Sequence, residues 1–248
     1  MSVQSIDRAF QVLKALAVEP SGITDLAQRV GLPKSTVARM LSSLEEQGAV
    51  TRGPDGNLFS IGMGLVELAG AIDATAALAT AVRPHLIWLS GQLGEAAGFS
   101  VPTGYTIQYM VQVESPTPVQ VRDYTGLTVP MHIGPSGLCV MAQWPPEEAE
   151  RYLGRTLEGY TPKTVVDPSR IRKRLDQIRS SGHCWIYEEF AEGINSVAAP
   201  VLTESNRVLG AIHVHGPAYR FPAEGSADSI AALVMDAAAR FSIRPEAV

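Results

Sequence analysis

The chain has 248 residues, of which 46% are hydrophobic and 18% charged, and its formal net charge is -5. This composition excludes a disordered protein, and the acidic balance means that any nucleic-acid binding must depend on local positive charge. No apolar run approaches the roughly 20 residues of a membrane span, and the first ten residues do not resemble a signal peptide. The two cysteines, Cys139 and Cys184, lack metal-type spacing. We therefore expect a cytoplasmic protein with no membrane partner.

Three helices and a hairpin are predicted within the first sixty residues. Residues 5–18 show helical periodicity, and the face expected to be buried comprises Ile6, Phe10, Leu13 and Ala17, widened by Ala9 and Leu16. A short second helix follows from residue 24, and a third ends near residue 47, where Gly48 is a typical left-handed terminator. Residues 49–61 then predict strand, turn and strand. This is the outline of a winged helix-turn-helix.

The third helix has one apolar and one polar face. Its apolar side chains are expected to pack on the first two helices, and Asp25 is the single acidic residue between residues 23 and 44. Small hydroxyl side chains allow close approach to a major groove, and Arg39 can donate two hydrogen bonds to guanine. Arg8 and Arg52 are expected to contact phosphates. The predicted DNA-binding residues are Arg8, Lys34, Ser35, Thr36, Arg39, Ser42 and Arg52. The alternative is a three-helix unit with a solvated polar face.

Strands and helices are interspersed in the rest of the chain. We predict a winged helix-turn-helix domain over residues 1–61, a helical linker over 62–75 and an effector-binding domain over 76–248. Expected strands cover residues 96–101, 106–114, 119–124, 184–190, 195–202 and 208–214. Expected helices cover residues 136–143, 146–153, 168–180 and 222–241. The predicted fold class is α+β, with a mainly antiparallel sheet flanked by helices.

Several segments resemble one family of regulators. The stretch GITDLAQRVGLPKSTVARMLSSLEEQGAV, opened by QSIDRAFQVLKAL, resembles the DNA-binding half of the IclR (isocitrate lyase regulator) family. PMHIGPSGLCVMA and GHCWIYEEFAEGINSVAAPVLTESNRVLGAIHVHGP resemble two segments of its C-terminal half, in the expected order. The resemblance implies a GAF-like effector-binding domain, a homodimer or homotetramer, and double-stranded operator DNA with an inverted repeat.

The resemblance also implies where an effector binds, above one face of the sheet. The contacts made by the start of a helix fall on Pro135 and Ser136. Ile186 stands where the family has an acidic residue, and Ser196 stands where some members have a cysteine that contacts small ligands. The differences concentrate at the ligand site, which implies a changed ligand on an unchanged sensor.

Two histidines replace serines of the family at the same site. His213 and His215 share one face of a strand, because side chains two residues apart point the same way. Two imidazoles offer donors to a carboxylate, and the body of the ligand could lie against Ile186 and Ile194. Further apolar and aromatic walls could come from Trp185, Met110, Tyr124 and Met131. We therefore expect a small carboxylic acid, larger than glyoxylate and aromatic in character. The alternative is a histidine pair that is hydrogen-bonded inside a packed sheet.

Two further classes of function were weighed. A metal- or redox-sensing regulator would use His213 and His215 with a cysteine or with His132, but the sequence shows no spaced third ligand. No metal site and no cofactor are therefore predicted. The chain also lacks a Gly-x-Ser-x-Gly elbow, a phosphate loop and a dinucleotide fingerprint. The sequence thus predicts a ligand-responsive DNA-binding transcriptional regulator without catalytic activity.

Overall fold

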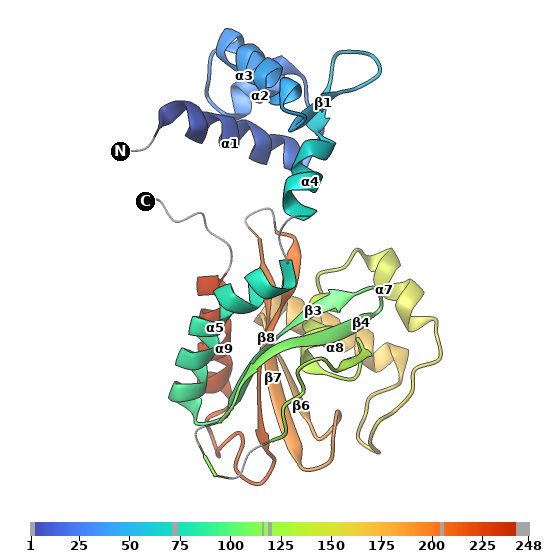
Figure 1. Cartoon of the computed structure of the whole chain (residues 1–248). Helices are drawn as coiled ribbons and strands as arrows, with labels where there is room; N and C mark the ends of the chain where they lie inside the picture. The colour runs from blue at the N-terminus through green and yellow to red at the C-terminus, as the bar shows by residue number, and fades with distance from the viewer. Residues whose placement is uncertain (1–2, 71–73, 116, 119–120, 204–205, 242–248) are drawn as a thin grey trace. The chain divides into compact units, whose positions relative to one another are not determined.

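The computed structural model describes residues 3–70, 74–115, 117–118, 121–203 and 206–241. The chain divides into two compact units, Met1–Ala74 and Thr75–Pro245. Figure 1 shows the course of the chain through both. Among the described residues, no helix combines the length and apolar character that a membrane crossing requires.

The first unit is a winged helix-turn-helix followed by one further helix. Its elements are α1 (Gln4–Val18), α2 (Ile23–Arg29), α3 (Lys34–Glu46), β1 (Val50–Arg52), β2 (Phe59–Ile61) and α4 (Met63–Gly70). The antiparallel β1–β2 hairpin forms the wing, and Phe59 also pairs with Ser21 through two backbone hydrogen bonds of 3.0 Å. Gly48 ends α3 with a φ of 68°, a conformation that favours glycine.

The buried face of α1 differs from the prediction. Val12 and Leu16 are buried, whereas Ile6 and Phe10 are 54% and 59% exposed. The expected stripe was therefore wrong at Ile6 and Phe10, whereas Leu16 is buried and Leu13 packs against the core as expected. The helix carries apolar residues around more than one face, and helical periodicity alone does not determine which face the neighbouring helices cover.

The second unit is built on a six-stranded antiparallel sheet with the order β5-β4-β3-β8-β7-β6. The strands are β3 (Ala96–Thr103), β4 (Thr106–Val113), β5 (Thr128–Pro130), β6 (Cys184–Tyr187), β7 (Ile194–Leu202) and β8 (Val208–Pro217). The helices are α5 (Ala74–Leu93), α6 (Pro135–Met141), α7 (Pro146–Leu153), α8 (Pro168–Ser181) and α9 (Ala227–Phe241). The predicted α+β class is confirmed.

The two faces of this sheet carry separate hydrophobic cores. One face packs against α5 and α9, which lie side by side in Figure 1, and buries Leu86, Val197 and Val234. The opposite face packs against α6, α7 and α8 and buries Leu138 and Ile186. Because side chains alternate along each strand, neighbouring residues belong to different cores.

Some predicted elements are shorter or absent. Residues 121–124 form no strand, and residues 119–120 lie outside the described part. The segment is instead held by the side chain of Gln112, which donates to the Arg122 carbonyl and accepts from the Tyr124 amide, each at 3.4 Å. β6 ends at Tyr187 because Glu188 takes a φ of 57°. α9 begins at Ala227 rather than at residue 222.

Candidate functional sites

The polar face of α3 is exposed to solvent. Its exposed side chains are Lys34, Ser35, Arg39 and Ser42, and Thr36 is half-buried beside them. On the other side Val37 and Leu41 are fully buried, which fixes the helix against the core of the unit. The first turn contains no acidic residue. An anchored helix with hydrogen-bond donors facing solvent has the features that major-groove reading requires.

Two arginines outside α3, Arg52 and Arg8, were also predicted to contact DNA phosphates. Arg52 is exposed on the wing, where its guanidinium lies 4.8 Å from the centre of the Phe59 ring and 3.4 Å from the Glu45 carboxylate. An exposed ion pair of this kind contributes little to stability, so Arg52 can exchange Glu45 for a phosphate. Arg8 is half-buried on α1.

In the second unit His213 and His215 lie together on β8. Their ring centroids are 5.6 Å apart and their planes differ by 16°. The opposite positions on β3 are Gly98 and Ala96, and these small residues leave space for the two rings. A Cβ atom on Gly98 would lie only 2.4 Å from Nε2 of His213. Both histidines are buried.

Two tyrosine rings pack on the histidines, and a phenylalanine ring packs on the tyrosines. Tyr109 lies edge-on to His213, with centroids 5.0 Å apart, and Tyr124 lies edge-on to His215, with centroids 5.4 Å apart. Phe190 contacts both tyrosines, at 6.1 and 5.1 Å. These five residues are called the aromatic–histidine cluster below. Sequence analysis did not select Tyr109 or Phe190, because they are far from the histidines along the chain.

The polar atoms around the cluster are incompletely satisfied. Nε2 of His213, Nε2 of His215 and Oγ of Ser136 are buried and have no hydrogen-bond partner within the described residues. Burial lowers the pKa of His215 to about 4, and burial together with the neighbouring His215 lowers the pKa of His213 well below its usual value. Both imidazoles are therefore neutral at neutral pH. A buried polar group without a partner costs about 1–3 kcal/mol, so a ligand that supplies partners gains affinity.

Most of the predicted effector residues share this face of the sheet. Ser196 pairs with Ile186 on one side and with His215 on the other, and Ile194 lies two residues before it on the same face. Pro135 and Ser136 begin α6, which packs on the same core. The structure therefore brings together seven of the eight predicted positions: Pro135, Ser136, Ile186, Ile194, Ser196, His213 and His215.

Trp185 is the exception. It stacks on Tyr187 with ring centroids 5.8 Å apart, contacts Phe221 at 5.3 Å, and joins the core formed with α5 and α9. Its neighbour Ile186 points into the other core. Trp185 therefore lies on the opposite face of the sheet from His213 and His215, because adjacent residues on a strand face opposite sides.

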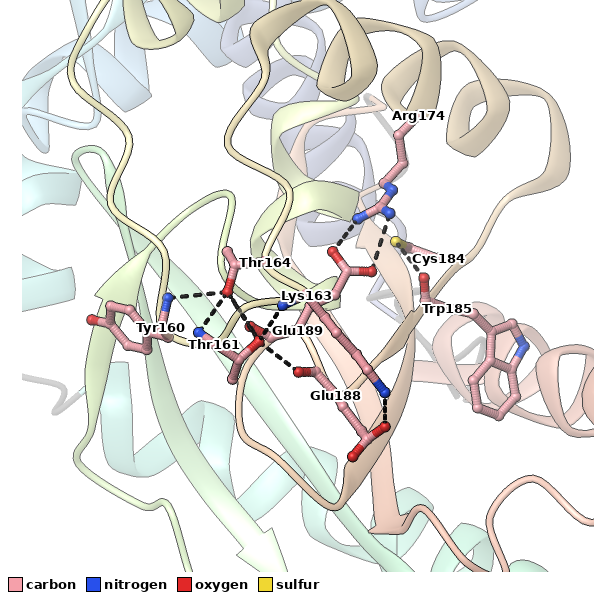
Figure 2. A network of polar contacts seen from close by, with 9 residues as sticks. All are labelled: Tyr160, Thr161, Lys163, Thr164, Arg174, Cys184, Trp185, Glu188 and Glu189. Atoms are coloured by element: carbon pink, nitrogen blue, oxygen red, sulfur yellow. Dashed lines mark hydrogen bonds and ion pairs between the residues drawn. The ribbon is translucent and has the colours of Figure 1, made fainter.

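A polar network holds the segment that carries Phe190. Figure 2 shows that Arg174 of α8 makes two hydrogen bonds to the Glu189 carboxylate, of 2.7 and 3.1 Å. Thr164 donates to the Glu189 carbonyl and Thr161 donates to the Glu188 carbonyl, at 2.6 and 2.8 Å. The segment after β6 is thus tied to residues 161–164 and α8, which fixes Phe190 against the two tyrosines.

The alternative of a metal or redox site depends on a third ligand for His213 and His215 or on a reactive cysteine. The described residues contain no group of three or more histidine, cysteine or acidic side chains that could hold a metal ion. His132 is engaged elsewhere, with Nδ1 at 2.6 Å from the Tyr152 hydroxyl and Nε2 at 2.9 Å from the Glu158 carbonyl. Burial raises the pKa of Cys184 to about 12 and also raises that of Cys139, so neither thiol is a ready nucleophile.

Family models match both halves of the chain. The model described as the IclR helix-turn-helix domain matches residues 5–54, and the model described as bacterial transcriptional regulator IclR C-terminal matches residues 71–243. An HTH-type transcriptional regulator of Mycobacterium tuberculosis is 32% identical over 222 residues, which cover 88% of this chain and 84% of that protein. The transcriptional repressor IclR of Escherichia coli is 30% identical over 224 residues, covering 88% of this chain and 81% of that protein.

Solved structures resemble the whole chain. A putative IclR transcriptional regulator from Silicibacter has a TM-score of 0.71 and 25% identity, covering 99% of this chain and 98% of its own. An IclR homologue from Microbacterium hydrocarbonoxydans, solved in complex with 4-hydroxybenzoate, has a TM-score of 0.62 and 23% identity, covering 96% of this chain and 97% of its own.

Proposed function

The chain belongs to the IclR family of bacterial transcriptional regulators, a family of regulators and not of enzymes, and we propose how it works. Residues 1–61 bind an inverted repeat in operator DNA, residues 62–75 form the linker, and residues 76–248 bind a small aromatic carboxylic acid. The DNA-binding units adopt one arrangement that can bind the operator and another that cannot. Effector binding alters operator affinity because these two arrangements differ in their affinity for the effector. Binding to the chromosome places the protein in the cytoplasm.

One observation carries the DNA-binding proposal: α3 has a buried apolar side and an exposed polar side without an acidic residue in its first turn. Arg39 lies in the middle of the exposed side, with Ser35 one turn before it and Ser42 one turn after it on the same face. Arg39 is therefore placed to read a base. Arg52 on the wing and Arg8 on α1 contact phosphates, which carry no sequence information.

Gel-shift titration of arginine variants tests this division of roles. Operator sequence is first selected from a random duplex library with the wild-type protein. Arg39→Ala is expected to weaken binding to the selected sequence by about 1–3 kcal/mol and to relax its specificity, whereas Arg52→Ala weakens binding to all sequences similarly. Unchanged affinity of Arg39→Ala for the selected operator would remove α3 from the reading role.

Assembly as a homodimer or homotetramer follows from the exposed apolar surface and from the symmetry of operators. Ile6 and Phe10 on α1, and Met63 and Leu68 on α4, are large apolar side chains that lie exposed in a single copy. Contact with a second copy would remove them from water. Two copies related by a twofold axis read two half-sites of an inverted repeat.

The effector proposal rests on the aromatic–histidine cluster. Its rings offer an apolar, aromatic surface, and the unpartnered atoms of Ser136, His213 and His215 offer polar contacts to one small molecule. Pro135, Ile186, Ile194 and Ser196 complete the surroundings. The complex of an IclR homologue with 4-hydroxybenzoate supports an aromatic acid as the chemical class.

A thermal-shift screen tests the effector class. Aromatic monocarboxylates are expected to raise the melting temperature, because a ligand that binds only the folded protein stabilises it by mass action. Glyoxylate and short aliphatic acids serve as controls and should produce no shift. An aromatic acid that raises the melting temperature should also change operator affinity in the gel shift. If no aromatic acid raises the melting temperature, the proposal is contradicted.

A further inference from the structure

An ion pair connects the end of α3 to the wing of the first unit. Nη2 of Arg52 on β1 lies 3.4 Å from the Glu45 carboxylate, and the two side chains are 48% and 36% exposed. Charge-assisted hydrogen bonds between such groups are commonly about 2.7–2.9 Å long, so this contact is a weak one. A weak ion pair in contact with solvent is readily exchanged for another partner.

The stem of Arg52 is held in place, whereas its charged end can change partner. Arg52 lies opposite Phe59 in the β1–β2 hairpin, and its guanidinium lies 4.8 Å from the centre of that ring. Phe59 is buried, so its ring is a fixed support for the guanidinium. A guanidinium carries five N–H donors in a planar fork, and the contact with Glu45 is made by Nη2. The same fork matches the oxygen atoms of a phosphate.

Two adjacent carboxylates end α3, but they face different directions. Successive residues of an α-helix lie about 100° apart around its axis. Glu46 lies one turn after Ser42 and continues the exposed side of the helix. Glu45 lies one turn after the buried Leu41, and its carboxylate reaches the wing arginine. The fold thus gives these two neighbouring acids different partners, although they are equivalent in charge.

The charge balance of the first unit gives this ion pair weight. Residues 3–70 contain six basic and seven acidic side chains, which leaves a balance of -1. Affinity for DNA depends on contacts between basic side chains and phosphates, because these contacts release counterions from the DNA. A carboxylate that occupies Arg52 therefore competes with phosphate for one of the few cations that this unit offers.

Resting on the proposed contact of Arg52 with phosphate, we propose that Glu45 limits the DNA affinity of the protein by standing in for a DNA phosphate at Arg52. In the free protein the guanidinium pairs with Glu45, and on DNA it exchanges this carboxylate for the backbone. The exchange weakens binding to every sequence alike, because phosphates carry no sequence information. A site must therefore add base contacts to α3 before it is stably occupied.

A double-mutant cycle on DNA affinity tests this proposal. The probe is a fluorescently labelled DNA duplex of random sequence, titrated with the whole chain at several NaCl concentrations. Glu45→Gln is expected to raise the affinity about threefold for each bound copy, because it removes the competitor of the phosphate. The same substitution in the Arg52→Ala background should change the affinity little. The gain should shrink as the salt concentration rises, since salt screens the exposed pair.

Glu46→Gln is the matched control, since it removes the same charge from the next position of α3. Any effect that it has on affinity should be the same with and without Arg52→Ala. If Glu45→Gln lowers the affinity, leaves it unchanged, or raises it equally in both backgrounds, this proposal is overturned and the proposed role of Arg52 stands. If Arg52→Ala alone leaves the affinity for the random duplex unchanged, the proposed phosphate contact is wrong, and this inference fails with it.

Discussion

The two units of this protein place their functional groups in opposite environments. In the first unit the side chains proposed to read DNA are exposed on α3, above a core that they do not enter. In the second unit most of the groups proposed to bind the effector are buried, and three of their polar atoms have no hydrogen-bond partner among the described residues. A change on α3 should therefore alter function with little effect on folding. A change in the effector unit should affect folding and function together.

The largest expected effect concerns the contribution of the buried Arg174–Glu189 ion pair to the stability of the second unit. Glu189→Ala leaves Arg174 without its partner in a largely buried position and should lower the free energy of unfolding by about 3 kcal/mol. Glu150→Ala is the matched control, since Glu150 forms an equally short two-bond pair with Arg172 at the surface. Urea unfolding should show a clear loss for the first variant and almost none for the second; equal losses would contradict the role of burial.

The next effect follows from the neutral histidines. The pKa of His215 is about 4 in the folded protein and near 6.5 in the unfolded chain, so the unfolded chain binds more protons between these values. Stability contributed by the neutral ring is complete above about pH 6.5 and is lost as the pH falls toward 4, by about 3 kcal/mol in all.

Comparison of wild type with His215→Phe isolates this contribution, because phenylalanine keeps the ring contacts but does not titrate. Unfolding free energies measured from pH 4 to 7.5 should fall less steeply on acidification in the variant. Parallel profiles would mean that His215 is solvated and that the buried site differs from the one described.

A smaller effect concerns the space beside His213. Gly98→Ala would place a Cβ 2.4 Å from Nε2 of His213 and should reduce stability by about 1–3 kcal/mol through overpacking. Gly91→Ala is the control, since nothing lies within 4 Å of its added Cβ and the residue is within α5. There alanine should leave stability unchanged or raise it. Thermal unfolding of both variants gives the comparison, and a harmless Gly98→Ala would show that His213 has room to move.

The smallest effect on folding belongs to the exposed face of α1. Phe10→Ser should change the stability of the isolated copy by no more than about 0.5 kcal/mol, because the side chain is 59% exposed. It should nevertheless weaken self-association and operator binding. Light scattering at several concentrations measures the first and gel shift the second. A variant that assembles as well as wild type would place the contact between copies elsewhere.

The sequence by itself determined much of this protein. Periodicity and turn residues located the three N-terminal helices and the wing. The polar side of α3 was predictable because an α-helix has 3.6 residues per turn, so that residues three or four apart lie on the same face. The helix expected over residues 168–180 is α8, which Asp167 caps by accepting from the Ser169 and Arg170 amides. Alternation along β8 was enough to put His213 and His215 on one face.

Tertiary structure alone decided the rest, because it depends on which elements meet. Nothing local to α1 distinguishes the buried Val12 from the exposed Phe10; the positions of α2 and α3 make that choice. Tyr109 and Phe190 come from segments that are far apart. Only the sheet order brings Tyr109 onto His213, and only the network around Glu189 fixes Phe190 against Tyr109. The neutral state of the imidazoles has the same origin, since burial and the lack of a partner arise from packing and not from the residue type.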